Sequence, residues 1–426
     1  MEVALLFVIL FGLIALRVPI AFALIASSLA ILVGFLDTSP KLIASKLTGT
    51  LDDWVWVAVP LFILLGGVMG STGVTRRLFD FAQAVVGHFW GGLSHVSVLT
   101  NTMLSGMSGS ILADAAATGS IVAPSMRQAG YPPGYTAAIV GAGAIIGPLI
   151  PPSIIFIIIG TIGNISIMRL WLGGVVPGVM TAFALLVVGY WISRKKGFPH
   201  EPRASWGKRS RTFLIALPAL FVPVIIVGGM RLGYVTPTEG GAIGIAYVLL
   251  LSFTMYREAK FKDFATVAID TVKTSGNIFF LIASALTFSW VLSVAGTADA
   301  VVDTITSITE SPLAFLFLVN VVFLFLGCII EGTPLYLIFV PFLMPVVHSY
   351  GIHPVHFGVV FAYVILIGQL TPPMGLTMFL VCSITGADTT EYVRMGWPLL
   401  VALLLVLTLI TLFPTLVLWL PTLVMG

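Results

Sequence analysis

The chain has 426 residues, of which 58% are hydrophobic and only 9% are charged. Soluble domains carry about a quarter charged residues, so this composition excludes a soluble protein and indicates an integral membrane protein. The net charge is only +3, and Cys328 and Cys382 stand in separate apolar runs without Cys/His metal spacing. We therefore expect no disulfide, no zinc-type site and no nucleic-acid partner.

The long apolar segments predict membrane-spanning helices, because lipid offers a backbone no hydrogen-bond partners and the ~10-residue alternation of a β-barrel is missing. Residues 2–36 would form a helix of about 50 Å, too long for a ~30 Å hydrocarbon core. Arg17 and Pro19 divide this run into spans at 2–16 and 18–36. The first has no basic n-region or cleavage site, so we interpret it as a span rather than a signal peptide.

Three further spans are predicted in the first half, at 54–71, 134–163 and 171–193. Between them, residues 93–128 are apolar but interrupted by Ser105-Gly-Met-Ser-Gly-Ser110. This pattern predicts a re-entrant helical hairpin with the Gly/Ser stretch at its tip. The second half repeats the order, with a hairpin at 312–349 whose tip lies near Gly327 to Pro334. Its spans are predicted at 213–231, 238–256, 275–295, 355–385 and 396–420.

Two charged amphipathic stretches, 41–53 and 261–274, precede the third and eighth spans. They are predicted either as arms lying along the membrane interface or as solvated loop faces.

The two halves share Gly and Pro positions at a constant offset of 221 residues. From 43 Gly and 25 Pro in 426 residues, chance gives about 0.6 matches across 106–152, whereas seven are present, which indicates an internal repeat. The matched pairs are Gly106/Gly327, Pro124/Pro345, Gly130/Gly351, Pro133/Pro354, Gly147/Gly368, Pro151/Pro372 and Pro152/Pro373.

The predicted architecture is an all-α polytopic membrane protein made of an inverted repeat. Residues 1–193 form the first half, with its hairpin at 93–128 and a broken helix at 134–163. Residues 194–212 form a basic linker, and residues 213–426 form the second half, with its hairpin at 312–349 and a broken helix at 355–385. Each half has five spans plus a hairpin, and because five is odd, the halves are inverted relative to one another. A membrane protein duplicated in this way is typical of a secondary transporter.

Lys and Arg predict the orientation, because cytoplasmic loops are enriched in them. The linker is the most basic segment, so we expect it to be cytoplasmic and both termini to be periplasmic. Only Lys41, Lys46, Arg169 and Arg231 then fall outside. The sixteen basic residues expected inside are Arg17, Arg76, Arg77, Arg127, Arg194, Lys195, Lys196, Arg203, Lys208, Arg209, Arg211, Arg257, Lys260, Lys262, Lys273 and Arg394.

The paired prolines predict cation sites. A proline cannot donate to the carbonyl four residues earlier, so Pro151-Pro152 and Pro372-Pro373 each release two carbonyls. Small hard cations bind such oxygens together with hydroxyls. The predicted sodium ligands, one group per half, are Ser105, Ser108, Ser110, Gly147 and Pro148, and then Gly327, Thr333, Gly368, Gln369 and Thr371. The alternative is that the prolines only kink packed helices.

Two carboxylates lie near the predicted tips, Asp114 and Glu331. Carboxylates inside a membrane are costly, so each is predicted either to balance a cation or to shape a substrate pocket; equally, each could complement the dipole at a helix start. Helix N-termini at the tips suit a carboxylate substrate. The predicted substrate contacts are Ser108, Ser110, Asp114, Ser153 and Glu331.

Other functions have weaker support. Gly106-Met-Ser-Gly109 reads as the GxSG of an intramembrane serine protease, yet His95 lies in the same hairpin arm and no other span has a central His to act as base. No P-loop is present, so we expect no nucleotide. His353 and His356 lack a third ligand, so no metal other than sodium is predicted. A stand-alone sodium–anion symporter remains the main alternative, and a channel fits broken helices less well than a transporter.

The run from Ser105 through Asp114, Gly119 and Ser120, followed by Gly147 and Ile150-Pro-Pro-Ser153, resembles the large membrane subunit of tripartite ATP-independent periplasmic (TRAP) transporters. The second half agrees in Glu331, Pro334, Pro341, Pro345, Gly351 to Gly358, Gly368 and Thr371-Pro-Pro373. The resemblance covers essentially the whole chain. Glu331 departs from it, since Asp is expected there in many members, and no clear carboxylate-binding Arg is evident in the transport half of the second repeat.

The resemblance implies a sodium-driven importer of organic acids in the bacterial inner membrane, working by an elevator motion. The transported acid could be a dicarboxylate, a sugar acid or a keto acid. The resemblance also implies two partners, a small four-helix membrane subunit and a soluble periplasmic substrate-binding protein. Residues 54–193 and 275–420 are expected to contain the mobile transport domain. Ser108, Ser110 and Asp114 fall at the family's functional positions in the first hairpin.

Overall fold

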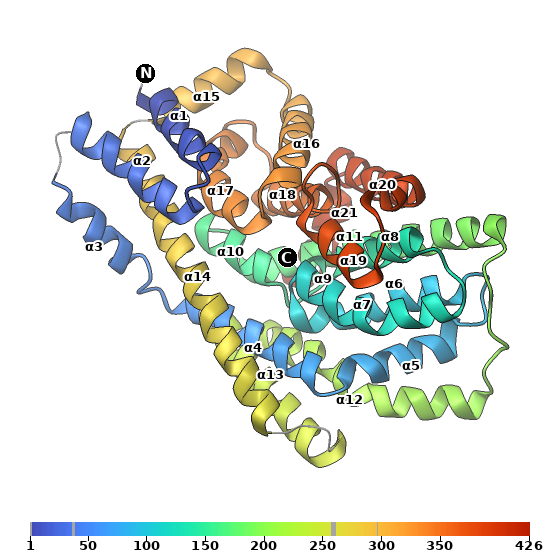
Figure 1. Cartoon of the computed structure of the whole chain (residues 1–426). Coiled ribbons are helices and arrows are strands. Elements are labelled where there is room, and N and C mark those ends of the chain that lie inside the picture. The colour runs from blue at the N-terminus through green and yellow to red at the C-terminus, as the bar shows by residue number, and fades with distance from the viewer. Residues whose placement is uncertain (1, 36–38, 257–260, 296) are drawn as a thin grey trace.

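The computed structural model describes residues 2–35, 39–256, 261–295 and 297–426. Side chains are described throughout these ranges except at 2–4, 107–108, 261, 297–301 and 304. Arg257 and Lys260, two of the basic residues used for orientation, lie outside the described residues. Every regular element within the ranges is helical, as predicted (Figure 1).

The first half comprises α1 (Glu2–Ala15), α2 (Ile20–Gly34), α3 (Lys41–Gly49), the 3-10 helix η1 (Trp54–Val57), α4 (Ala58–Ser71), α5 (Val74–Val86), α6 (Gly92–Ser108), α7 (Ile111–Gln128), α8 (Pro133–Ala144), α9 (Ile146–Leu149), α10 (Ile154–Ile162) and α11 (Ile167–Lys196). The second half comprises α12 (Trp206–Arg231), α13 (Pro237–Leu251), the π-helix η2 (Ser252–Tyr256), α14 (Phe261–Val294), α15 (Thr297–Ile308), α16 (Pro312–Ile329), α17 (Gly332–Ser349), α18 (Pro354–Gly368), α19 (Leu376–Thr385), α20 (Thr389–Leu412) and α21 (Thr415–Met425).

Eight helices in the described part of the chain are long and apolar enough to cross a membrane, and the bent pair of Pro133–Leu149 and Ile154–Ile162 makes nine. The bend between these two segments is 46°, which confirms the predicted break at Pro151-Pro152. Helices α1, α2, α18, α19 and α21 are apolar but shorter. Arg17 lies between α1 and α2, so residues 2–34 form two helices, as predicted for this run.

The two hairpins form where the sequence predicts them, as α6–α7 and α16–α17. Their tips are tighter than expected. Helix α6 continues to Ser108 and turns at Gly109, whose φ of +58° favours glycine, so Ser105 lies inside the helix rather than at the tip. The second tip is formed by Ile330 and Glu331. Figure 1 shows the first hairpin on the side of the 194–212 linker and the second on the side of α15.

Three elements differ from the predicted boundaries. The stretch at 261–274 is not a separate arm but the first part of α14, which runs continuously for 34 residues. The last span ends at Leu412, because Pro414 starts a separate helix, α21. Helix α5, between the third span and the first hairpin, was not predicted. Within the stretch at 41–53, only Lys41–Gly49 forms a helix, α3, and the Lys46 ammonium lies 5.1 Å from the centre of the Trp290 ring of α14.

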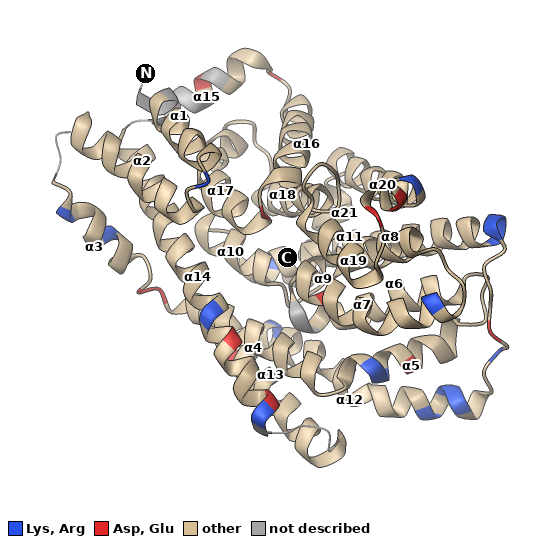
Figure 2. Cartoon of the chain, viewed as in Figure 1, with Lys and Arg blue, Asp and Glu red and all other residues tan. Residues whose placement is uncertain are grey.

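Basic side chains gather where α11 ends and α12 begins, next to α5 (Figure 2). The Arg209 guanidinium donates to the Ala84 carbonyl of α5 at 3.1 Å, which joins α5 to the start of α12. Burial, Arg209 and Arg203 together lower the pKa of His88, which lies just after α5. This end of the molecule therefore carries a concentrated positive charge.

Helix α11 packs closely on the first break because it presents glycines there. A Cβ at Gly174 would overlap the Leu149 carbonyl oxygen and the Phe156 ring, and one at Gly178 would come within 2.7 Å of Ile150. The indole N–H of Trp171 donates to the Ser153 carbonyl at 3.1 Å. The interrupted backbone is thus held by a neighbouring helix rather than exposed to lipid.

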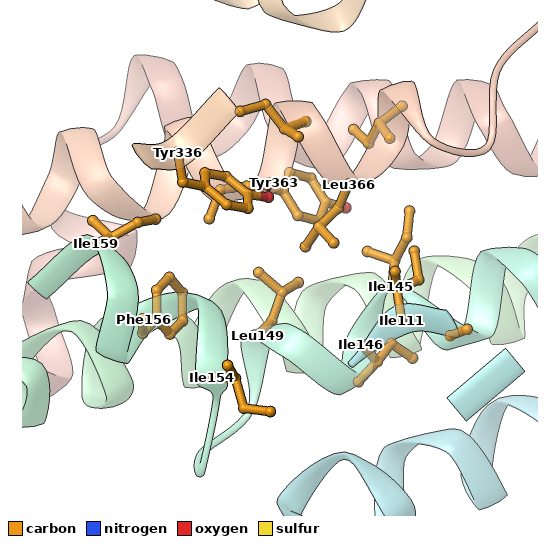
Figure 3. Packing of buried hydrophobic residues seen from close by; sticks show 14 of the residues in the cluster. Ile111, Ile145, Ile146, Leu149, Ile154, Phe156, Ile159, Tyr336, Tyr363 and Leu366 are labelled. Carbon is orange, nitrogen blue, oxygen red and sulfur yellow. Dashed lines mark hydrogen bonds between the residues drawn. The ribbon is translucent and has the colours of Figure 1, made fainter. Parts of the chain in front are cut away.

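Bulky apolar side chains join the first break to the second half. Figure 3 shows Phe156 and Leu149 pointing toward Tyr336 of α17 and Tyr363 of α18. Both tyrosines are fully buried. The Tyr336 hydroxyl donates to the Ala362 carbonyl at 3.1 Å, and the Tyr363 hydroxyl lies 2.8 Å from the Thr181 hydroxyl of α11. This core fixes the two broken helices against each other.

The Gly174→Ala substitution should destabilise the fold by about 1–3 kcal/mol, because the added methyl meets a backbone carbonyl that cannot rotate away. The matched control is Gly228→Ala in α12, where an added Cβ meets nothing within 4 Å and the change should stay within about 0.5 kcal/mol. The measurement is the midpoint of thermal unfolding in detergent. Equal midpoints for the two variants would contradict the close packing of α11 on the break.

Candidate functional site

A cavity of about 470 Å³ lies where both hairpin tips meet the first break, and α4 and α14 close it on the other side. We call it the central cavity. The first tip contributes Gly109 to Ala113, and the second contributes Glu331 to Thr333. Helix α10 adds Ile154, Ile155 and Ile158, and the second break adds Gln369. Segments from both halves of the repeat therefore line one site.

The first tip rests directly on the first break. A Cβ at Gly109 would come within 2.9 Å of the Ile154 nitrogen and 3.2 Å of the Pro152 carbonyl oxygen, so only glycine fits. Ser110 caps α7 by accepting from the Ala113 N–H at 3.4 Å. Ser153 caps α10 in the same way, by accepting from the Phe156 N–H at 3.4 Å. Two predicted site serines thus define the starts of the helices that face the cavity.

The second tip rests on the second break through glycines. A Cβ at Gly368 would lie 2.8 Å from the backbone of Gly327, and one at Gly332 would lie 2.8 Å from the Gln369 side-chain nitrogen. Glu331 is the N-cap residue of α17 and is solvent-accessible in the cavity wall. Gly327 therefore serves close packing between α16 and α18.

The repeat relates Ser110 to Glu331, because the offset of 221 residues joins them and both are N-cap residues. By the same offset, Asp114 corresponds to Leu335, so it has no acidic counterpart. The two tips thus have equivalent N-cap positions in the backbone, but their acidic side chains lie at different positions.

Three helix N-termini converge on the central cavity, those of α7, α10 and α17. The first N–H groups of a helix lack partners within it and attract negative charge. The residues that line the cavity include two carboxylates, Asp270 and Glu331, but no Lys or Arg. Such a wall offers backbone donors to an anion and oxygen atoms to a cation.

Asp114 lies outside the lining of the central cavity. It is only 1% exposed and occupies the first turn of α7, next to the first break. A Cβ at Gly147 would overlap its carboxylate, so the absence of a side chain at Gly147 makes room for it. This position favours the predicted role of balancing a cation at the break over direct contact with a substrate in the central cavity.

The carbonyls at the second break are not left without partners, so that part of the sequence prediction is wrong. The Gly368 carbonyl accepts from the Thr371 N–H at 2.9 Å, and the Gln369 carbonyl accepts from the N–H groups of Thr377 and Met378 at 3.1 and 3.3 Å. The chain curls back after the prolines, and this requires Gly375, whose Cβ would lie 2.6 Å from the Gln369 carbonyl. Each carbonyl keeps a second lone pair that a cation can use.

The other predicted residues are distributed as follows. The Ser105 hydroxyl donates to the Thr102 carbonyl within α6 at 2.5 Å, and the Thr371 hydroxyl donates at 2.9 Å to the carbonyl of Ile367, in the last turn of α18. Thr333 lines the central cavity. Pro148 is buried in α9 beside Gly147. The Ser108 side chain lies outside the described residues.

The sequence reading missed the contribution of α4 and α14. Gly66 and Gly67 of α4, and Asp270, Thr271 and Thr274 of α14, line the central cavity. A signal for α14 was present, since a carboxylate and two hydroxyls recur at helical spacing in the stretch taken for an arm.

No group of three or more His, Cys, Asp or Glu that could hold a metal ion occurs in the part of the chain that the structure describes. His353 caps α18 by accepting from the Val355 N–H at 3.2 Å, and His356 lies 2.8 Å from the Ile410 carbonyl. Both histidines are engaged with the backbone, and cation binding by oxygen atoms of the tips and breaks stays a prediction.

Comparison with known proteins identifies the family. Residues 7–416 match the family described as "Tripartite ATP-independent periplasmic transporter, DctM component". The chain is 38% identical to the sialic acid TRAP transporter large permease protein SiaM of Vibrio cholerae, over 97% of both chains. It is 34% identical to the 2,3-diketo-L-gulonate TRAP transporter large permease protein YiaN of Escherichia coli, over 96% of both. It is 35% identical to the C4-dicarboxylate TRAP transporter large permease protein DctM of Pseudomonas aeruginosa, over 91% of both.

The fold is also similar to a solved transporter, the YdaH protein of Alcanivorax borkumensis, with a TM-score of 0.62 at 13% identity over 87% of this chain and 86% of that one. At this identity, the similarity concerns the fold alone. The helical architecture and the paired hairpins are consistent with the family that matches nearly the whole sequence. The chain belongs to the TRAP transporter family as a DctM-type large permease component, and it is a multi-pass inner-membrane transporter subunit rather than an enzyme.

Proposed function

We propose that this subunit imports organic acid anions by sodium symport, with an elevator motion of the two hairpins and broken helices. The observation that carries the proposal is the central cavity, where both tips, the first break and three helix N-termini meet. Broken helices that supply N-termini for an anion and backbone oxygens for a cation are typical of secondary transporters.

The relatives support an organic acid as substrate. Their names give sialic acid, 2,3-diketo-L-gulonate and C4-dicarboxylates, all of which carry a carboxylate. A volume of about 470 Å³ is in the range of small-molecule sites, ~300–1,000 Å³. The converging N–H groups of α7, α10 and α17 would receive the carboxylate.

The charge of the cavity lining supports the proposed sodium coupling. Asp270 and Glu331 would repel an anion, and no basic residue of the lining offsets them. Sodium bound by the tips and breaks would lower this repulsion, and Asp114 would supply the negative charge that keeps the first sodium near Gly147. The anion would then enter a site in which bound sodium already offsets the negative charge of the two carboxylates.

The family description, tripartite, supports two partners for this subunit. A small four-helix membrane subunit would brace the fixed helices, and a periplasmic binding protein would deliver the substrate. In this arrangement the 194–212 linker and its surrounding basic cluster face the cytoplasm, and both termini face the periplasm.

Uptake of labelled organic acids into proteoliposomes tests the proposal. The liposomes contain this subunit and its small partner, and the binding protein and an inward sodium gradient are omitted in turn. We expect transport only when both are present. Uptake that ignores the sodium gradient would defeat the symport mechanism, and uptake with sodium but without binding protein would favour a stand-alone symporter.

The Asp114→Asn substitution should lower the initial uptake rate about ten- to a hundredfold, because interactions with a charged group contribute about 1.5–3 kcal/mol. It should also raise the sodium concentration needed for half-maximal uptake. The matched control is Asp303→Asn on the exposed face of α15, which should behave like the parent protein. Unchanged sodium dependence in the Asp114 variant would remove this residue from the cation site.

Arg127 connects the two halves of the mobile part. Its guanidinium donates to the Thr385 carbonyl at 2.7 Å, at the C-terminal end of α19, where a positive charge also complements the helix dipole. Because the side chain is exposed, we expect Arg127→Ala to slow uptake only about two- to fivefold. The apparent affinity for substrate should stay unchanged. Arg194→Ala, an exposed change at the end of α11, is the control, and an equal effect of both would contradict the link.

A further inference from the structure

A second cavity of about 360 Å³ lies beside the central cavity, between α4, the start of α5 and the first turns of α7. The two cavities share three lining residues, Gly66, Gly67 and Ala113. These three residues have at most a methyl side chain, so little side-chain volume stands between the cavities. The second cavity is therefore a continuation of the space around the first hairpin tip.

Two buried polar side chains line the second cavity, Thr75 and Asp114. Thr75 is only 4% exposed, and its hydroxyl oxygen has no hydrogen-bond partner among the described residues. A buried hydroxyl without a partner is costly, so a molecule in the cavity that hydrogen-bonds to it or binds its oxygen is favoured. Its volume of about 360 Å³ far exceeds the ~30 Å³ that one water occupies in the liquid, so the cavity has room for several waters around a small cation.

The face of α7 that lines this cavity continues to the end of the helix. Ala113, Ala117, Ser120 and Pro124 follow one another at steps of three and four residues, which places them on one face. Ser120, Pro124 and, farther along, Arg127 are exposed. Figure 1 shows α7 running beside α4 and α5 toward the end of the molecule that carries the linker.

We propose that the second cavity is an aqueous vestibule for the coupling cation, hydrated sodium. The cation passes through it between Asp114 and the basic end of the molecule, where α11 ends and α12 begins. On this route the Thr75 hydroxyl is a ligand. The proposal rests on the sodium symport proposed above. It adds a route and a residue, Thr75, that neither the repeat nor the proline breaks indicated.

The other candidate occupant is a lipid chain, since most of the lining is small and apolar. Lipid would leave the Thr75 hydroxyl and the Asp114 carboxylate facing hydrocarbon, which is unfavourable for both. Water with a dissolved cation gives the Thr75 hydroxyl a partner and keeps polar surroundings beside the Asp114 carboxylate. Accessibility to a charged reagent separates these two occupants directly.

Thiol labelling of the full chain in oriented membrane vesicles tests the vestibule. The background carries Cys328→Ala and Cys382→Ala, because both native cysteines are buried and would otherwise contribute slow signals. The probe is a charged, membrane-impermeant methanethiosulfonate reagent, which reacts with the thiolate that forms only in contact with water. A117C places a thiol in the cavity wall, and A115C, two residues away on a fully buried position of the same helix, is the matched control.

We expect A117C to react at least about tenfold faster than A115C, from the same membrane face that labels an R203C variant of the exposed linker. Labelling of A117C as slow as that of A115C from both faces would overturn the vestibule, since the cavity would then be dry or filled by lipid. Labelling only from the face opposite to R203C would overturn the direction of the route.

Substitution of Thr75 tests whether its hydroxyl binds the cation. Thr75→Val keeps the shape and removes the hydroxyl, so it should raise the half-saturating sodium concentration of uptake about two- to tenfold. Thr75→Ser keeps the hydroxyl and should behave like the parent protein. The control is Thr100→Val, because Thr100 is also buried with no partner for its hydroxyl among the described residues but does not line either cavity. Equal sodium dependence for Thr75→Val and Thr100→Val would overturn the role of Thr75.

The two experiments also separate this inference from the proposed function. Labelling needs no transport, so a wet cavity in a protein whose uptake ignores sodium would leave the vestibule standing and defeat the symport. A dry cavity in a protein with sodium-driven uptake would defeat the vestibule alone.

Discussion

A backbone that leaves the α-helix inside a membrane must find its hydrogen bonds within the protein, and this constraint organises the structure. The two Pro-Pro breaks satisfy it differently. At the first, Trp171 of α11 donates to the Ser153 carbonyl, and glycines of α11 let that helix come close. At the second, the chain curls back so that α19 donates to Gln369. Glycine lies beside each break, Gly174 and Gly178 of α11 at the first and Gly375 at the second, although these three are not repeated positions.

The repeat preserves the backbone and changes the chemistry. Ser110 and Glu331 occupy the same N-cap position in the two hairpins, and one is neutral while the other is a carboxylate. Asp114 lies buried next to the first break, where the second half has Leu335. The two halves therefore present negative charge at different depths, in the open cavity in one case and behind the tip in the other. Two cation sites built on this scaffold would differ in affinity even though their backbones are alike.

How much the sequence predicts depends on whether the cause is local. The spans, hairpins and breaks follow from apolar length, Gly and Pro, and nearly all of them form where predicted. The first tip is tighter than the Gly/Ser run suggested, because α6 continues through Ser105 to Ser108 and only Gly109 and Ser110 separate it from α7. The partners of Gln369 and the lining by α4 and α14 arise from tertiary packing between distant segments, which no local pattern encodes. Asp270 and the two α14 hydroxyls were visible in sequence, but their helix had to be placed before their role could be inferred.

The way the hairpin tips pack against α4 and α14 bears on how easily the tips could move. Where α4 meets α14, a Cβ at Gly67 would come within 2.6 Å of Val267, so this wall is itself tightly packed. The tips meet the wall mainly across the two cavities, over Gly66, Gly67 and the small side chains of α7. A surface of small residues offers few interlocking side chains, so a part that slides along it meets little steric resistance. The same lack of side chains leaves room for water and ions. In the proposed elevator motion, the small residues at the boundary between α4 and the first hairpin would serve both the sliding and the access of ions.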